Sequence, residues 1–442
     1  GGAGSRGWAV DGDAGRGGRG GFGGGQGSDG AGRDGGGGSG FGGAIFVRDG
    51  GSLLITGDTL FADNGVIGGS SNNGGRAGAA AGSDIFMMRG SSVTIAPGIG
   101  NDAVFNGDIA DDSRASYEEA SNGVGAGAGL TIGAGLTQFN GRNTYTGATT
   151  IVGGALAAID GVGVHPNSNI TFNGSNALGE ANAGVLLSAG SFNRQVGTLS
   201  NRVQWTGSGG FAAAGDTLVV NLGGTTTPQT MRWNTYGFVP TGHALVFGAA
   251  YADALVILRN AIDLNGGEGW IVVHDNPGSD GDAAVLMGPL SNGSLRVGAE
   301  GYEGHLNLRG LNTFTDGLSI DRGTVDTTGG GTLADTLAVV VSEHGVFIVG
   351  TPDAIGALVN EGGVHVGEAL TVASLVNNGM MTLDANLTAA GGVSSDGAIG
   401  VARSSRIVAP TFSGGADAVT TIGEGATLTL DQSGASTYAG VF

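Results

Sequence analysis

The sequence contains no cysteine and no lysine, and it has little proline, few aromatic residues and few charged residues. Without cysteine, neither a disulfide bond nor a cysteine nucleophile is available, and disulfides cannot indicate the redox compartment. Charged residues make up 13% and aromatic residues 6% of the 442 residues, whereas about 25% of an ordinary globular domain is charged. The composition therefore differs from that of an ordinary globular domain.

Positive charge is scarce. All 18 basic residues are arginines, and with 38 acidic residues the formal net charge is −20. Affinity for nucleic acids depends on clustered basic residues. The two Arg-Gly-Gly steps at Arg16 and Arg19 are typical of RNA-binding tails, but neighbouring aspartates balance their charge. The composition excludes nucleic acid as a partner and suits a soluble, acidic surface.

Long apolar runs are also absent. No stretch reaches the roughly 20 apolar residues that a membrane-spanning helix needs, so we expect no membrane span in this segment. The residues that follow Gly1 do not resemble a signal peptide. We therefore expect the sequence to be a mature or excised part of a longer protein.

Glycine is the most distinctive residue that is present. The chain has 96 glycines and yet 40% hydrophobic residues. Glycine loses the most backbone entropy on folding and offers no side chain for packing, so backbone hydrogen bonds must contribute much of the stability. Stacked short strands joined by tight turns meet this need and still bury a core.

Residues 1–43 form a Gly-rich segment of low complexity. Such a composition is typical of flexible tails. We expect it to become ordered either by packing along the rest of the chain or by contact with neighbouring copies, and we therefore interpret it as a possible assembly contact. Residues 44–442 are predicted to form the β-solenoid.

Internal repeats support a solenoid because they place equivalent residues in successive coils. One repeat has an offset of 40 residues, with a predicted surface loop at residues 65–83 between its copies. It matches Ile45 with Ile85, Gly50 with Gly90, Ser52 with Ser92 and Ile55 with Ile95.

A shorter repeat has an offset of 17 residues, enough for one coil of short strands and turns. It predicts that Leu358 stacks on Leu375 inside and that Asn360 stacks on Asn377 at a corner. Residues 252–264 could form a helix, but their Val and Ile content and the flanking glycines favour strands. We therefore predict an all-β fold, a right-handed parallel β-helix (β-solenoid).

The longest repeat has an offset of 169 residues and relates residues 143–156 to residues 312–325. A truncated third copy occupies residues 436–442, so we expect more protein to follow. The first copy reads Asn-Thr-Tyr-Thr-Gly from Asn143 to Gly147, and the second has Asp316 in place of the final glycine.

The 143–156 unit resembles the passenger-associated repeat of autotransporter passenger domains, also called the autotransporter-associated β-strand repeat. Residues 203–211 and the phrases at 42–45 and 61–64 are similar to shorter motifs of autotransporter-like and polymorphic outer-membrane proteins. The resemblance covers most of the chain after residue 42. It implies a passenger β-helix that is exported across the outer membrane to the bacterial cell surface or the extracellular space.

The sequence shows no catalytic signature. It contains no Gly-x-Ser-x-Gly motif and no His-x-x-x-His zinc pair. We predict no catalytic, cofactor-binding or metal-binding residues, and hence no enzyme and no cofactor. The six histidines are interpreted as structural or solvated: His165, His243, His274, His305, His344 and His365.

Two polar loops remain candidates for ligand binding, although a solvated excursion and a plain turn are the favoured interpretations. The loop at residues 111–122 contains five acidic or aromatic residues. In the loop at residues 274–282, Asp275, Asp280 and Asp282 could share a calcium ion, but their spacing fits no known calcium loop.

The predicted function is that of an extracellular structural surface protein that mediates adhesion or self-association, as a fibre or a surface layer. Its expected partners are identical chains, with a host surface or glycan as a further possibility. The alternative is an enzymatic or glycan-binding passenger that acts on polysaccharide. It would use exposed rings beside carboxylates, but we interpret the available rings mainly as core or coil-capping residues: Trp205, Trp233, Trp270 and Tyr236.

Overall fold

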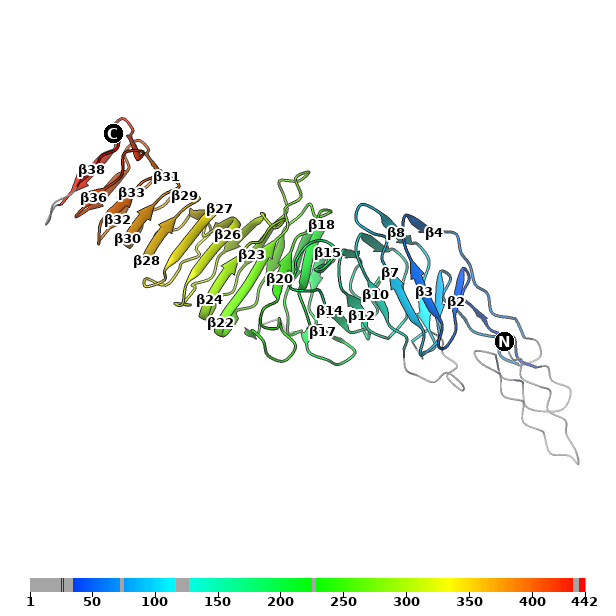
Figure 1. Ribbon diagram of the computed structural model, residues 1–442. Coiled ribbons are helices and arrows are strands. Elements are labelled where there is room, and N and C mark those ends of the chain that lie inside the picture. Colours follow the sequence, from blue (N-terminus) through cyan, green and yellow to red (C-terminus); the bar gives the residue numbers. More distant parts are fainter. Residues whose placement is uncertain are drawn as a thin grey trace, which may run out of the picture. The chain divides into compact units, whose positions relative to one another are not determined.

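The computed structural model describes residues 25, 27, 35–71, 75–113, 115–116, 127–224, 228–431 and 437–441. In these ranges the regular structure consists of strands, with no α-helix. The strands pair mostly in parallel with strands that follow later in the chain (Figure 1). The prediction of an all-β chain is thereby confirmed.

The chain divides into two compact units. Unit 1 comprises Gly1–Gly174, Glu180–Leu186 and Gly197–Gln204, and unit 2 comprises Ser175–Gly179, Leu187–Val196 and Trp205–Phe442. The predicted boundary between residues 43 and 44 stays a prediction, because most of the Gly-rich segment lies outside the described residues.

The strands that lie wholly within unit 1 are short, with two to four residues each. They are β1 (Gly40–Phe41), β2 (Ile45–Val47), β3 (Ser52–Ile55), β4 (Thr59–Phe61), β5 (Ala80–Ala81), β6 (Ile85–Met87), β7 (Ser92–Ile95), β8 (Asp102–Phe105), β9 (Ile109–Asp111), β10 (Leu130–Ile132), β11 (Leu136–Phe139), β12 (Thr149–Ile151), β13 (Ala155–Ala157) and β14 (Ile170–Phe172).

Two strands contain residues of both units, namely β15 (Gly184–Phe192) and β17 (Arg202–Trp205). The strands of unit 2 are β16 (Gln195–Val196), β18 (Gly209–Val220), β19 (Met231–Arg232), β20 (Ala244–Phe247), β21 (Val256–Leu258), β22 (Ile262–Val273), β23 (Ala283–Leu286), β24 (Leu290–Val297), β25 (His305–Leu308), β26 (Leu318–Asp326), β27 (Val339–Val349), β28 (Asp353–Asn360), β29 (Gly363–Val366), β30 (Leu370–Asn377), β31 (Met380–Leu383), β32 (Leu387–Ala389), β33 (Val393–Ser395), β34 (Ala398–Val401), β35 (Arg406–Ala409), β36 (Phe412–Ser413), β37 (Val419–Ile422) and β38 (Thr427–Leu430).

Strand pairing in unit 1 follows the 40-residue repeat. β2 pairs with β6 so that Ile45 lies opposite Ile85, and β3 pairs with β7 so that Ile55 lies opposite Ile95. The N–H of Gly50 donates to the carbonyl oxygen of Gly90 at 3.3 Å, which aligns the turns as well. The predicted register is therefore confirmed.

Strand pairing in unit 2 follows the 17-residue repeat. β28 pairs with β30 so that Leu358 lies opposite Leu375, and both side chains are buried. At the end of the same strands Asn360 lies opposite Asn377, and its Nδ2 donates to Oδ1 of Asn377 at 2.7 Å. Both predicted ladders, one apolar and one of amides, are confirmed.

The 169-residue repeat gives two asparagines the same buried role. Oδ1 of Asn143 accepts the N–H of Ile109 at 2.7 Å, and its Nδ2 donates to the carbonyl oxygen of Gly163 at 2.7 Å. Asn312 likewise accepts from the N–H of Leu290 at 2.9 Å and donates to the carbonyl oxygen of Thr332 at 2.9 Å. In each copy one side chain joins the segments before and after it.

The aromatic residue of this repeat is fully buried in both copies. In the first copy the hydroxyl of Tyr145 lies 2.7 Å from Oγ1 of Thr149. In the second copy Phe314 and Leu318 replace this pair, so the buried hydroxyl and its partner are lost together. This joint change leaves no buried hydroxyl without a partner, which would be costly.

Residues 65–83 lie at the surface, as predicted: among the described residues of this range only Ala81 and Gly82 are buried, and Ile67 is 89% exposed. Their backbone is nevertheless hydrogen-bonded. The N–H of Gly69 donates to the carbonyl oxygen of Gly38, the N–H of Gly78 to that of Gly69, and the N–H of Gly37 to that of Arg76. Three extended stretches are thus bonded to one another, and β1 pairs with β5 beside them. Much of this insertion is therefore hydrogen-bonded backbone at the surface. Its partner, residues 37–43, belongs to the Gly-rich segment, which in this part packs along the chain itself.

Close packing requires glycine at Gly37. A Cβ there would overlap the carbonyl oxygen of Gly69, whereas a Cβ on the neighbouring Gly38 would meet nothing within 4 Å.

The predicted preference for strands over a helix in residues 252–264 is confirmed, because β21 lies within this range and β22 begins there.

Candidate functional site

The first polar loop is buried at residues 111–113, so its interpretation as a solvated excursion is wrong for Asp111 and Asp112 and stays a prediction for the rest of the loop. Asp111 and Asp112 are almost inaccessible to solvent. Oδ2 of Asp111 accepts the N–H groups of Ala128 at 3.1 Å and Thr146 at 2.7 Å, so this carboxylate joins two later segments. Burial raises the pKa of Asp112. The hydrogen bond that this carboxylate accepts from the N–H of Arg89 lowers the pKa and offsets part of the rise. Tyr117, Glu118 and Glu119 lie outside the described residues.

The second polar loop is a turn closed by its own last carboxylate. Oδ2 of Asp282 accepts the N–H of Asn276 at 2.7 Å. Burial raises the pKa of Asp282, and this hydrogen bond opposes the rise. Asp275 and Asp280 are exposed. Within the described ranges no group of three or more His, Cys, Asp or Glu residues could hold a metal ion.

A serine and a histidine that are far apart in the sequence lie together in unit 2. Oγ of Ser208 is 3.3 Å from Nδ1 of His243 and also accepts the N–H of Ala244 at 3.1 Å. Ser208 is fully buried, so a substrate cannot reach its hydroxyl. The pair therefore fits a structural histidine better than a nucleophile with its base.

The remaining histidines of unit 2 contact strand neighbours or loop residues. His365 Nδ1 lies 3.0 Å from Oγ1 of Thr382, and the His274 ring meets Tyr302 edge-on with centroids 5.7 Å apart. His344 is exposed. In unit 1, Nδ1 of His165 accepts the N–H of Asn167 at 3.1 Å.

The rings divide into core and surface. Trp205 and Trp233 are buried, which confirms their interpretation as core residues. Trp270 is half-buried, and the guanidinium of Arg296 lies 4.6 Å from its ring centroid. Tyr236 is 88% exposed, so the interpretation of the rings as core or coil-capping residues is wrong for this side chain.

The most strongly shifted carboxylate of unit 2 belongs to Asp326, on β26. Its Oδ2 lies 3.2 Å from Nε2 of His305 and accepts Nδ2 of Asn307 at 3.2 Å, and its Oδ1 accepts the N–H of Thr328 at 2.7 Å. Burial alone would raise the pKa of Asp326. The hydrogen bonds from His305 and Thr328 outweigh burial and lower the pKa from 3.8 to about 2.

We expect Asp326 to make stability depend on acid. Because its pKa is lower in the folded chain, the ionised form stabilises unit 2 above pH 3.8, and this contribution is lost as the pH falls toward about 2. Asp326→Asn should lower the free energy of unfolding by up to about 2 kcal/mol at pH 7 and have little effect at pH 2. Urea unfolding at several pH values measures this difference. The exposed Asp335→Asn is the control, and an Asp326→Asn effect independent of pH would contradict the assignment.

Unit 2 also carries an uncharged, partly apolar face, which we call the outer strip. It is formed by outward side chains of β27, β29, β31, β34 and β37, which lie opposite one another in the parallel register. A bridge between Val419 and Val441 extends its first row. The two rows are Val346, Gly363, Met380, Ala398, Val419 and Val441, then Ile348, His365, Thr382, Gly400 and Thr421.

Every residue of the first row except Gly363 is exposed to solvent, and the second row is exposed at Thr382 and Thr421 and half-buried elsewhere. Met380 is 62% exposed and Val419 is 44% exposed, with alternate residues of the same strands buried beneath them. Neither row contains Asp, Glu or Arg, and the one ionisable residue is His365. Sequence reasoning missed this face. The available signal was that β31 and β37 have apolar residues on both faces of the strand, the outward face as well as the inward one.

Comparison with known proteins gives no relative. No protein-family model matches the chain, and no curated protein and no solved structure is similar to it at the significance required. Among the described residues, no helix is long and apolar enough to cross a membrane.

Proposed function

We propose that this chain is a right-handed parallel β-helix of the autotransporter-passenger type, displayed at the bacterial cell surface or released outside the cell. It acts there as a structural protein in adhesion or self-association, and the outer strip is its contact surface. The observation that carries this proposal is an exposed, uncharged face on a chain with a net charge of −20.

Parallel pairing at short sequence offsets supports the β-helix. Strands 17 residues apart, such as β28 and β30, pair in register over most of their length, and the same holds for β29 and β31. Each short strand buries its inward residues against equivalent residues of the next, which is how repeat proteins build a core. The equivalent bridges of Asn143 and Asn312 support the resemblance to the passenger-associated repeat.

Two glycines support a contact role for the outer strip. Gly363 and Gly400 occupy outward strand positions without a positive φ, and a Cβ would meet nothing closer than 3.5 Å at the first and 4.0 Å at the second. Glycine weakens a strand interior by about 0.5–1 kcal/mol relative to alanine. In strands it often marks a place where another molecule approaches closely. The fold does not need these glycines, so we assign them to contact.

Exposed Met and Val side chains support the same role. Monomeric proteins seldom expose contiguous apolar patches beyond a few hundred Å², and larger patches usually mark interaction sites. Along the outer strip, six residues of the first row follow one another at about 4.8 Å per strand. The first row is therefore continuous from Val346 to Val441, and its exposed large hydrophobic side chains are those of Val346, Met380, Val419 and Val441.

Adhesion of the displayed chain should depend on Met380. We expect beads coated with the full chain to bind host cells or one another, and Met380→Glu to reduce this binding several-fold, because a charge would then have to be desolvated in the contact. Counting bound or clustered beads by microscopy measures the effect.

Val376→Glu is the matched control, because Val376 is also on an outward position of unit 2 but belongs to β30, outside the outer strip. Equal loss of binding in both variants would show that any added charge acts, and unchanged binding of Met380→Glu would reject the outer strip as the contact.

A further inference from the structure

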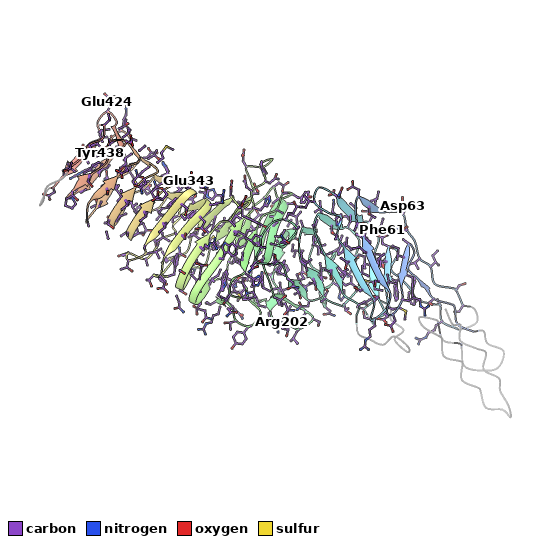
Figure 2. The ribbon with its side chains drawn as sticks, in the orientation of Figure 1. Phe61, Asp63, Arg202, Glu343, Glu424 and Tyr438 are labelled. Carbon is purple, nitrogen blue, oxygen red and sulfur yellow. The ribbon has the colours of Figure 1, made fainter. Side chains whose placement is uncertain are left out.

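Acidic residues flank the outer strip on both sides. On one side they lie two or three residues before the outward stretches of β27, β29, β34 and β37, and on the other side one or two residues after those of β29, β31 and β37. We call these exposed side chains the acidic rim, and Figure 2 labels Glu343 and Glu424 among them. The acidic rim consists of Glu343, Glu361, Asp396 and Asp417 before the strands and Glu368, Asp384 and Glu424 after them.

Little positive charge offsets the acidic rim. Arg403 pairs with Glu424 at 2.6 Å, and His365 Nε2 lies 3.7 Å from Oδ2 of Asp384. From residue 331 to residue 442, Arg403 and Arg406 are the only basic residues apart from histidine. The surface therefore combines an apolar centre with negatively charged edges.

From this geometry we infer that the outer strip docks a cationic amphipathic segment of a partner protein, one apolar face flanked by Lys or Arg. The inference rests on the proposed function and names the partner of the same surface. Apolar side chains of the segment would cover Met380 and Val419, and its basic residues would lie against the acidic rim.

Charge favours such a segment over a second copy of this chain. Face-to-face docking of two outer strips would bring the acidic rim of one copy toward that of the other. Like charges opposed across an interface disfavour association. A basic partner instead gains attraction from both edges, and that attraction is strongest at low salt.

The dimensions of the outer strip also fit a helix. Its paired stretches of four residues make it about 13 Å wide, and five spacings of about 4.8 Å make it about 24 Å long. An α-helix is about 10–12 Å across with its side chains and rises 1.5 Å per residue, so about 16 residues would cover the outer strip.

Binding of a designed peptide to the full chain tests the inference. The probe is an 18-residue helical peptide with leucine on one face and lysine on its flanks, and a lysine–glycine peptide of equal charge controls for attraction to an acidic chain. Isothermal titration should show tighter binding of the amphipathic peptide. Met380→Ser should weaken it about ten-fold, because much of a buried methionine contact is lost.

Matched variants separate the outer strip from the rest of the surface. Val376→Ser should leave binding unchanged, because Val376 lies outside the outer strip. The triple variant Glu361→Gln, Asp396→Asn, Asp417→Asn should weaken binding several-fold and reduce its dependence on salt. Strand content by circular dichroism should be unaltered in each variant, since all the substituted side chains are at least partly exposed.

Three results would overturn the inference: equal affinity for both peptides, equal weakening by Val376→Ser and Met380→Ser, or self-association that Met380→Ser abolishes while peptide binding persists. In the last case the proposed contact surface would stand and only the named partner would fall. Loss of bead adhesion independent of Met380, with peptide binding intact, would reject the proposed function instead.

Discussion

Asn377→Ala is expected to lower the free energy of unfolding of unit 2 by about 2–4 kcal/mol. The Asn377 side chain is fully buried. It accepts Nδ2 of Asn360 at 2.7 Å and donates to Oγ of Ser395 at 3.0 Å, so alanine would leave buried polar groups with fewer partners and open a cavity. Urea or guanidinium unfolding followed by circular dichroism measures the change.

The adjacent Asn378 provides a matched control. It is exposed and donates to Oε1 of Glu361 at 2.8 Å, a contact that water can replace. Asn378→Ala should therefore change stability by less than about 0.5 kcal/mol. Similar effects of the two substitutions would mean that the amide ladder does not stabilise the stacked strands.

Gly37→Ala is expected to disrupt the packed Gly-rich stretches of unit 1. The new methyl group would overlap the carbonyl oxygen of Gly69, and backbone cannot move aside as a flexible side chain can. Overpacking of this kind costs about 1–3 kcal/mol. Amide hydrogens of Gly69 and Gly78 should then exchange about ten-fold faster or more, because their hydrogen bonds open more often.

Gly38→Ala controls for the loss of glycine itself. A methyl group at Gly38 would have no heavy atom within 4 Å, and its backbone does not need a positive φ. Exchange at Gly69 and Gly78 should stay near the wild-type rate. If both alanines accelerated exchange equally, close packing at Gly37 would not be the cause.

Acid response and surface contact involve neighbouring residues of unit 2. The hydrogen bonds of Asp326 join β26 to His305 on β25, and Asp326 lies opposite Ile348, the first residue of the second row of the outer strip. Asp326→Asn is therefore used for acid stability alone, and peptide binding is tested with Met380→Ser on β31.

The sequence by itself determined the all-β class and the register of the repeats. Leu358 lies opposite Leu375, and Ile45 opposite Ile85, because equal spacing of apolar residues and turns leaves one pairing that buries them all. Asparagine at matching corners likewise predicted the stacking of Asn360 on Asn377. These features follow from local periodicity, which a sequence displays directly.

Only the tertiary structure decided which side chains face outward and which loops are buried. The Gly-rich stretches carry no side-chain pattern, so nothing in the sequence indicated that Gly69 bonds to Gly38. Asp111 is buried because donors from later segments reach it, and Tyr236 is exposed at a turn. The outer strip depends in the same way on strands brought side by side. Such contacts join residues distant in the sequence, and local spacing does not determine them.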